Sequence, residues 1–106
     1  MPLYVLVWEF HLKPERETDF ERHYGDQGTW CRLFQTGIGY KGTKLLKDSQ
    51  QSNRYITMDY WSSKEHYEQF LKEKQEEYAS IDRQCESLTD AESFIGSFHT
   101  IGSFNE

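Results

Sequence analysis

Two histidines are the side chains of this sequence best suited to proton transfer near neutral pH, because an imidazole titrates there. His66 lies one helical turn before Phe70 in an amphipathic pattern, which places it at the edge of the apolar face. His23 and Tyr24 lie just before a turn-like break in an earlier helical pattern, where the mouth of a pocket can form. His66 and His23 are therefore candidate catalytic bases. A solvated helix-edge histidine, and a surface histidine beside a core tyrosine, explain the same positions without chemistry.

Aromatic residues are the second group with a candidate role, since they make up 16% of the chain against a hydrophobic total of 36%. Rings that supply so much of the buried surface can also line a pocket for a flat apolar ligand. Trp61 stands where a strand pattern gives way to a helix pattern, and Trp30 and Phe34 are one helical turn apart. The candidate substrate-binding residues are Trp61, Tyr24, Trp30, Phe34 and Phe70. Ordinary core packing is the alternative for each of them.

Several other kinds of site are not expected. The sequence has no glycine-rich dinucleotide or phosphate loop, no paired-cysteine motif and no nucleophile elbow. Its histidines and carboxylates are too scattered to suggest a metal site, and Cys31 and Cys85 fall in helical patterns as small apolar groups. We therefore expect neither a metal nor a cofactor.

The charge and hydropathy of the chain indicate which classes of partner it does not bind. A formal net charge of −6 and the lack of any basic run argue against nucleic-acid binding. No apolar run approaches the roughly 20 residues needed to cross a bilayer, and residues 1–7 lack the basic start of a signal peptide. We expect a cytoplasmic protein that binds neither nucleic acid nor membrane.

The stretch that organises the chain is a strand that runs directly into a helix. Residues 54–61 are rich in β-branched and aromatic types that alternate along a strand. Ser62 followed by Glu65 forms a capping box, which predicts a helix start, and apolar residues continue at helical spacing to Leu88. The residues expected to share one face of the strand are Tyr55, Thr57 and Asp59.

The remaining elements follow from the same kind of pattern. Proline and acidic residues after a first strand predict a helix start at 13–17, and a turn-like segment at 25–28 predicts a break in that helical region. Three glycines precede a second strand, and a polar run at 48–53 predicts a hairpin loop. The expected strands other than 54–61 are 3–12, 40–46 and 92–101.

The order strand, helix, strand, strand, helix, strand predicts one ferredoxin-like α+β domain over residues 1–106. In this βαββαβ fold an antiparallel sheet has its helices on one face. Successive residues of the first strand point to opposite faces of the sheet, and both sets are apolar. The uncovered face therefore also carries apolar side chains. We expect that face to meet a second copy of the chain, which makes a homodimer.

The sequence resembles the antibiotic biosynthesis monooxygenase domains of the dimeric α/β barrel superfamily. The resemblance spans residues 5–98 and rests on the strand exit FHLKPE at 10–15, the strand entry IGYKGT at 38–43, and the strand and helix at 55–70. It implies a homodimer with a pocket between the helices and the sheet of each subunit. Some members of the family oxidise aromatic polyketides with dioxygen and neither metal nor flavin. Others degrade haem.

Two functions remain open at this stage. Haem-degrading relatives carry a tryptophan and a histidine at positions that Phe70 and Ser80 occupy here, so haem degradation is not expected. The first function is a cofactor-independent monooxygenase for a small electron-rich aromatic, with Trp61 holding the ring and His66 or His23 managing the proton. The alternative is a non-catalytic dimeric α/β-barrel module that binds a small apolar molecule.

Overall fold

The computed structural model describes residues 2–102, and within them the chain alternates strands and helices in the expected order. The elements are β1 (Tyr4–Leu12), α1 (Glu17–Tyr24), α2 (Thr29–Phe34), β2 (Tyr40–Lys47), β3 (Arg54–Trp61), α3 (Lys64–Glu73), α4 (Gln75–Cys85), the short 3-10 helix η1 (Glu86–Leu88) and β4 (Thr89–His99). None of these helices is long and apolar enough to cross a membrane.

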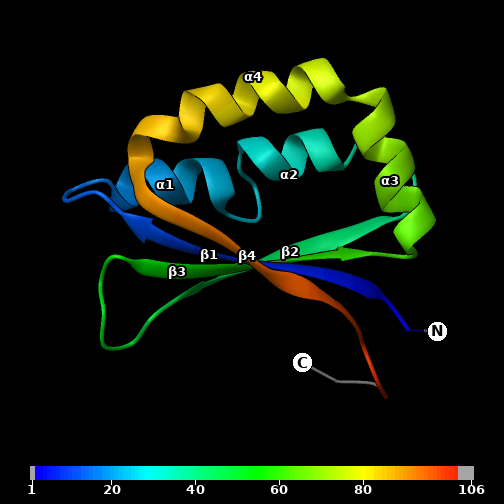
Figure 1. The fold of residues 1–106 in the computed structure, drawn as a ribbon, viewed down its shortest axis with the longest axis horizontal. Coiled ribbons are helices and arrows are strands. Elements are labelled where there is room, and N and C mark those ends of the chain that lie inside the picture. Colours follow the sequence, from blue (N-terminus) through cyan, green and yellow to red (C-terminus); the bar gives the residue numbers. More distant parts are fainter. Residues whose placement is uncertain (1, 103–106) are drawn as a thin grey trace.

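The strands form one antiparallel sheet in the order β2-β3-β1-β4. Helices α1 to α4 lie on one side of this sheet, and its other face carries no helix of residues 2–102 (Figure 1). The ferredoxin-like α+β fold expected from the sequence is therefore confirmed. The hairpin loop is confirmed too, because β2 ends at Lys47 and β3 begins at Arg54.

The alternation in β3 decides what faces the helices. Every second residue of this strand is buried, because Tyr55, Thr57, Asp59 and Trp61 all point to the helix side. Thr43 of β2 pairs directly with Asp59 across the two strands. Side chains of directly opposed residues lie on the same face, so this register brings a hydroxyl and a carboxyl together beneath the helices.

The first helical region is broken, as the sequence predicted, but it begins later than expected. The turn at 25–28 separates α1 from α2. Glu15 does not belong to the first turn of α1, because its backbone adopts a left-handed conformation with φ 64°. The helix begins at Glu17 instead, which places that carboxylate at the positive end of the helix dipole.

The expected central helix of residues 62–88 is wrong in three details. The chain divides into α3 and α4 at Lys74, whose φ of −117° and ψ of 30° are not helical, and the two helices point in different directions (Figure 1). The cap of α3 is Ser63 rather than Ser62, because Ser63 Oγ accepts a 3.1 Å hydrogen bond from the His66 amide. The end of α4 passes through η1 into β4 at Thr89, three residues before the expected strand.

The face of the sheet without helices is largely apolar. Val5 and Val7 of β1 lie on it beside Met58, Tyr60 and Phe98 of the neighbouring strands, and together they line a shallow hollow of about 170 Å³. Phe98 is 49% exposed. The structure holds a single chain, so the dimer expected from this face remains a prediction.

Candidate functional site

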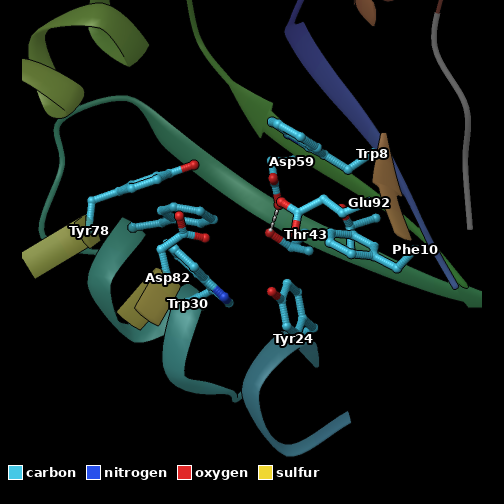
Figure 2. A pocket seen from close by; sticks show the side chains of 11 residues that line it. Trp8, Phe10, Tyr24, Trp30, Thr43, Asp59, Tyr78, Asp82 and Glu92 are labelled. Carbon is cyan, nitrogen blue, oxygen red and sulfur yellow. Dashed lines mark hydrogen bonds between the residues drawn. The ribbon is translucent and has the colours of Figure 1, made fainter. Parts of the chain in front are cut away.

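A small cavity lies between the helices and the covered face of the sheet (Figure 2). Its volume is about 40 Å³. Every strand and three of the four α-helices contribute to its wall, which is the arrangement expected for a pocket in an α+β sandwich. The lining residues are Trp8, Phe10, Tyr24, Trp30, Phe34, Thr43, Thr57, Asp59, Tyr78, Asp82 and Glu92.

Asp59 is the buried carboxyl group of the cavity. It is 9% exposed, and Oδ1 accepts a 2.7 Å hydrogen bond from the hydroxyl of Thr43 (Figure 2). Burial disfavours the charged form and raises the pKa of Asp59 to about 6, although the hydrogen bond from Thr43 opposes that rise. A carboxyl group with a pKa near 6 is mostly ionised at neutral pH and can still accept a proton from a ligand.

A chain of hydrogen bonds leads from Asp59 away from the cavity. The Thr43 hydroxyl is 2.6 Å from the hydroxyl of Tyr40, which is 3.3 Å from Cys31 Sγ. The thiol of Cys31 lies 3.2 Å from the carbonyl oxygen of Gly25, to which it donates. Because Thr43 donates to Asp59, its oxygen can only accept from Tyr40, and the single hydroxyl proton of Tyr40 is donated either to Thr43 or to Cys31 Sγ, not to both. The chain therefore fixes the orientation of Thr43 and, through it, that of the Asp59 carboxyl group.

Two further carboxylates, Asp82 and Glu92, line the cavity at its exposed side. The pKa of Glu92 is raised by partial burial and by the negative charge of Asp82. Neither forms an ion pair within residues 2–102 that the structure describes. The lining residues include no lysine, arginine or histidine. The cavity is therefore a negatively charged site.

Hydrogen-bond donors of the cavity come from aromatic side chains. Tyr24 and Tyr78 are protonated at neutral pH, as an ordinary phenol is, and burial raises their pKa values further. The indole N–H of Trp30 is buried and has no hydrogen-bond acceptor in the described part of the chain, although Tyr24 and Cys85 lie beside it. This N–H is therefore directed at Tyr24 and Cys85, and its nitrogen is not accessible from the cavity.

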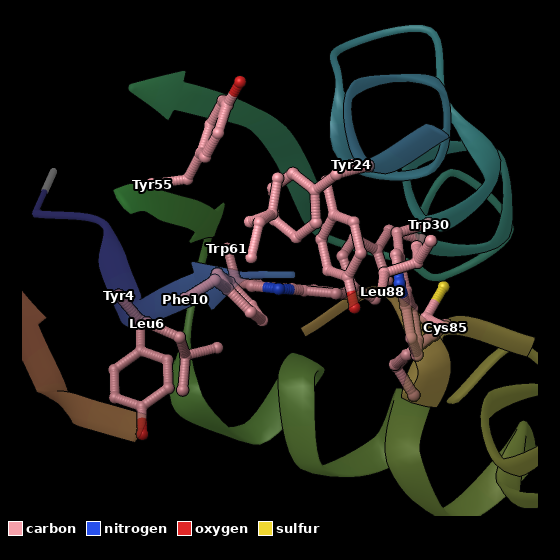
Figure 3. Packing of buried hydrophobic residues seen from close by; sticks show 13 residues of the cluster. Tyr4, Leu6, Phe10, Tyr24, Trp30, Tyr55, Trp61, Cys85 and Leu88 are labelled. Carbon is pink, nitrogen blue, oxygen red and sulfur yellow. The ribbon is translucent and has the colours of Figure 1, made fainter. Parts of the chain in front are cut away.

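Three of the five aromatic residues proposed from the sequence line the cavity, namely Tyr24, Trp30 and Phe34. The other two, Trp61 and Phe70, are 0% and 1% exposed and belong to the hydrophobic core. The ring of Phe34 joins the two groups, because it lies 6.0 Å from Trp61 and 5.4 Å from Phe70. Figure 3 shows Trp61 enclosed by this core. Its contact with a substrate stays a prediction, as does that of Phe70.

Neither histidine proposed as a base lines the cavity. His66 is exposed on α3, where its Nδ1 is 2.6 Å from the hydroxyl of Ser62. His23 lies at the end of α1 with Nδ1 2.9 Å from the hydroxyl of Thr29, and burial, together with the positive charge of Arg22, lowers its pKa. Their catalytic roles stay predictions.

Asp59, Asp82 and Glu92 were not proposed from the sequence. Asp59 carried a usable signal, because it shares the buried parity of β3 with Tyr55 and Thr57, and a carboxyl group on a buried face is uncommon. Asp82 and Glu92 carried none, since both resemble the many solvated acidic residues of this chain. Among residues 2–102, no three His, Cys, Asp or Glu side chains are grouped so that they could hold a metal ion.

Solved structures show which proteins share this architecture. SnoaB from Streptomyces nogalater, a cofactor-independent oxygenase, superposes with a TM-score of 0.72 at 17% identity over 100% of both chains. A mutant of SnoaB gives a TM-score of 0.79 at 16% identity over 98% of both chains. A Bordetella bronchiseptica protein assigned to the antibiotic biosynthesis monooxygenases gives 0.70 at 17% identity over 98% of this chain and 100% of that one.

The chain has the fold of the antibiotic biosynthesis monooxygenases. The resemblance found in the sequence is confirmed at this level. No protein-family model and no curated protein sequence matches the chain. The antibiotic biosynthesis monooxygenase fold is therefore carried here by a sequence that is at most 17% identical to the three structures named.

Proposed function

We propose that the protein is a cofactor-independent monooxygenase that acts on a small electron-rich aromatic molecule. The observation that carries the proposal is Asp59, a buried carboxyl group that lines a cavity walled by aromatic rings. Burying an ionisable group without a basic partner is unfavourable, and such groups occur preferentially at functional sites. SnoaB, which shares the fold, is a cofactor-independent oxygenase.

The residues of the cavity suit a phenol-type substrate. The ring binds among the rings of Trp8, Phe10 and Trp30, and its hydroxyl group reaches Asp59. The ionised carboxyl group accepts the hydroxyl proton, which leaves an electron-rich phenolate. Removing that proton is the task of a general base, and a pKa of about 6 suits it near neutral pH.

The chemistry then needs only the substrate and dioxygen. The phenolate gives one electron to O₂, and the resulting radical pair combines to form a bond between oxygen and a ring carbon. The O–O bond breaks as that carbon loses its hydrogen, so one oxygen atom becomes a carbonyl of the product. The other leaves as water together with the hydroxyl proton and the ring hydrogen. A phenol and O₂ thus give a quinone and water, and the substrate supplies all four electrons.

Thr43 tunes the acidity of Asp59, and Tyr24 and Tyr78 supply hydrogen bonds to the substrate oxygen. The hydrogen bond from Thr43 stabilises the ionised form of Asp59 and keeps one of its oxygens occupied. The protonated phenols of Tyr24 and Tyr78 can donate to the substrate or to a bound water. His66 and His23 remain alternative bases from the sequence, and variants of both belong in the experiment.

A non-catalytic dimeric module is the second candidate, and the small volume of the cavity favours the form of it in which the pocket is closed. Pockets for organic ligands commonly measure about 300–1,000 Å³, against about 40 Å³ here. A ring can enter only if side chains at the exposed side of the cavity move. Asp82 and Glu92 are exposed and free to do so, whereas a cavity that stays closed would leave the protein without a substrate.

We also propose that the domain expected over residues 1–106 works as a cytoplasmic homodimer. The uncovered sheet face supports this, because Val7, Met58 and Phe98 form an apolar surface that a monomer would leave partly in water. The second copy would close this face, while the cavity lies on the opposite side of the sheet. Binding and dimerisation are thereby expected to be separable.

Oxygen uptake with 1-naphthol and with a hydroxyanthrone tests the proposal. We expect uptake above the protein-free rate and a quinone that carries one labelled oxygen when the gas is ¹⁸O₂. Asp59→Asn keeps the shape and removes the base, so it should lower turnover by about 100-fold or more. His66→Ala and His23→Ala should retain activity if Asp59 is the base. Uptake no faster than in buffer, or undiminished in Asp59→Asn, would overturn the proposal.

A further inference from the structure

The charge of the cavity is unusual for a site that binds aromatic molecules. Three carboxyl groups line it, Asp59 at the buried side and Asp82 and Glu92 at the exposed side, and no basic side chain accompanies them. Partial burial and, after it, the negative charge of Asp82 raise the pKa of Glu92, so the two carboxyl groups repel each other. A ligand with a positive charge would relieve that repulsion, and a ligand with a negative charge would add to it.

The aromatic walls favour the same kind of ligand. The faces of Trp and Tyr rings attract ammonium groups, and Trp8, Trp30 and Tyr78 all line the cavity. Acidic groups together with aromatic rings form a site that can hold an organic cation without any metal.

The buried carboxyl group of Asp59 is an independent sign that a ligand belongs here. Asp59 is 9% exposed and lines the cavity, and within residues 2–102 only its Oδ1 is hydrogen-bonded, to Thr43. Its second oxygen can accept a hydrogen bond from a ligand hydroxyl group, which a phenol supplies. The cavity therefore offers separate partners for a hydroxyl group and for an ammonium group.

We propose that the cavity selects aromatic substrates that carry a basic amine, with the ring hydroxyl held by Asp59 and the ammonium group held by Asp82 and Glu92. That such amines are substrates rests on the proposed oxygenase function. That they bind preferentially rests only on the residues of the cavity. It excludes substrates with a carboxylate, because no group on the wall neutralises one.

Three ligands with the same ring separate charge from shape. Tyramine, 4-ethylphenol and 3-(4-hydroxyphenyl)propionate differ mainly in the group at the end of a short side chain, which is cationic, neutral or anionic. Isothermal titration calorimetry at neutral pH and low salt should give tyramine the lowest Kd, at least about tenfold below that of the acid. Added salt should reduce the difference, because the acidic groups at the mouth are exposed.

Variants that neutralise one carboxylate each test whether Asp82 and Glu92 cause the preference for tyramine. Asp82→Asn and Glu92→Gln should each weaken tyramine binding by several-fold and leave 4-ethylphenol nearly unchanged. Glu65→Gln is the matched control, since it removes one exposed carboxylate in the first turn of α3, away from the cavity. Equal affinity for the three phenols, a preference that survives both variants, or no binding of any of them would overturn the proposal.

Failure of the amine selectivity and failure of the oxygenase activity give different results in these experiments. Oxygen uptake with 1-naphthol but no preference for tyramine would retain the oxygenase and remove the amine selectivity. A preference for tyramine without oxygen uptake on any phenol would leave a site for aromatic amines and remove the oxygenase.

Discussion

The hydroxyl of Thr43 lies 2.7 Å from Oδ1 of Asp59, and the two residues face each other directly across β2 and β3. The pairing places an ionisable group on the buried face of the sheet with a neutral donor as its partner. A basic partner would have held the pKa of Asp59 low. A hydroxyl group leaves it near 6, in the range where a carboxyl group can work as a base.

Asp59→Asn should make the folded protein more stable at neutral pH. Burial raises the pKa of Asp59 from 3.8 to about 6, so the folded state binds this proton more tightly than the unfolded state. Its contribution to stability is therefore complete below about pH 4 and is lost as the pH rises through about 6. The asparagine escapes this loss, and the variant should gain on the order of 2–3 kcal/mol above about pH 7.

Urea unfolding of both proteins across this pH range measures the effect. The difference in free energy of unfolding should be small near pH 4 and grow toward neutral pH. A constant difference, or a variant that loses stability as the pH rises, would mean that Asp59 does not titrate as a buried acid.

Thr43→Val should raise the pKa of Asp59 further. The substitution keeps the side-chain volume and removes the donor that stabilises the ionised carboxyl group. We expect a rise of about one pKa unit, measured from the ¹³C chemical shift of the Asp59 carboxyl carbon. Thr57→Val is the matched control, because Thr57 is buried in the same cavity but donates no hydrogen bond to Asp59 in the structure. An equal shift in both variants would point to general packing rather than to this bond.

Gly39→Ala should destabilise the protein more than Gly42→Ala does. Both glycines have positive φ, 92° and 132°, which a side chain adopts with strain. At Gly39 an added Cβ would also lie 2.5 Å from Ser62 Oγ and 2.6 Å from His66 Nδ1, whereas at Gly42 it would meet nothing within 4 Å. The expected losses are about 1–3 kcal/mol for Gly42→Ala and more for Gly39→Ala, read from the midpoints of thermal unfolding. Equal losses would show that the contact of Gly39 with the start of α3 has no energetic weight.

Phe98→Asp should convert the expected dimer into a monomer. Phe98 is 49% exposed on the uncovered face of the sheet, beside Val5, and a carboxylate there would oppose burial against a second copy. Light scattering should give wild-type protein twice the mass of one chain and the variant the mass of one. Ile38→Asp is the control, because Ile38 is 80% exposed in the connection before β2. A wild-type monomer at micromolar concentration would contradict the homodimer.

The fold could be predicted because its signals are local. Alternation along 54–61, the glycines before β2 and the polar loop at 48–53 each determine one element without reference to the others. The main error is the single helix expected at 62–88, where two consecutive helices, α3 and α4, share one continuous apolar pattern. The chain turns at Lys74 between α3 and α4, and no glycine, proline or capping residue at Glu73, Lys74 or Gln75 marks a break in the sequence.

The site was harder to predict because its residues converge from distant parts of the chain. Tyr24, Trp30 and Phe34 were proposed as ring-binding residues, and they line the cavity. These residues lie on the apolar faces of their helices, and such a face packs against the sheet in any arrangement of the fold. Asp82 and Glu92 reach the same cavity only through the register of β1 with β4 and the position of α4, which no local pattern encodes.

The pH profile of oxygen uptake, measured with 1-naphthol for the wild-type protein and for Asp59→Asn, tests the central claim most directly. Turnover by the wild-type protein should rise with pH through about 6, because the base works only when Asp59 is ionised. In Asp59→Asn that rise should be absent and turnover low at every pH. An unchanged profile in the variant, or no uptake above the protein-free rate in either protein, would contradict the assignment of Asp59 as the base of an oxygenase.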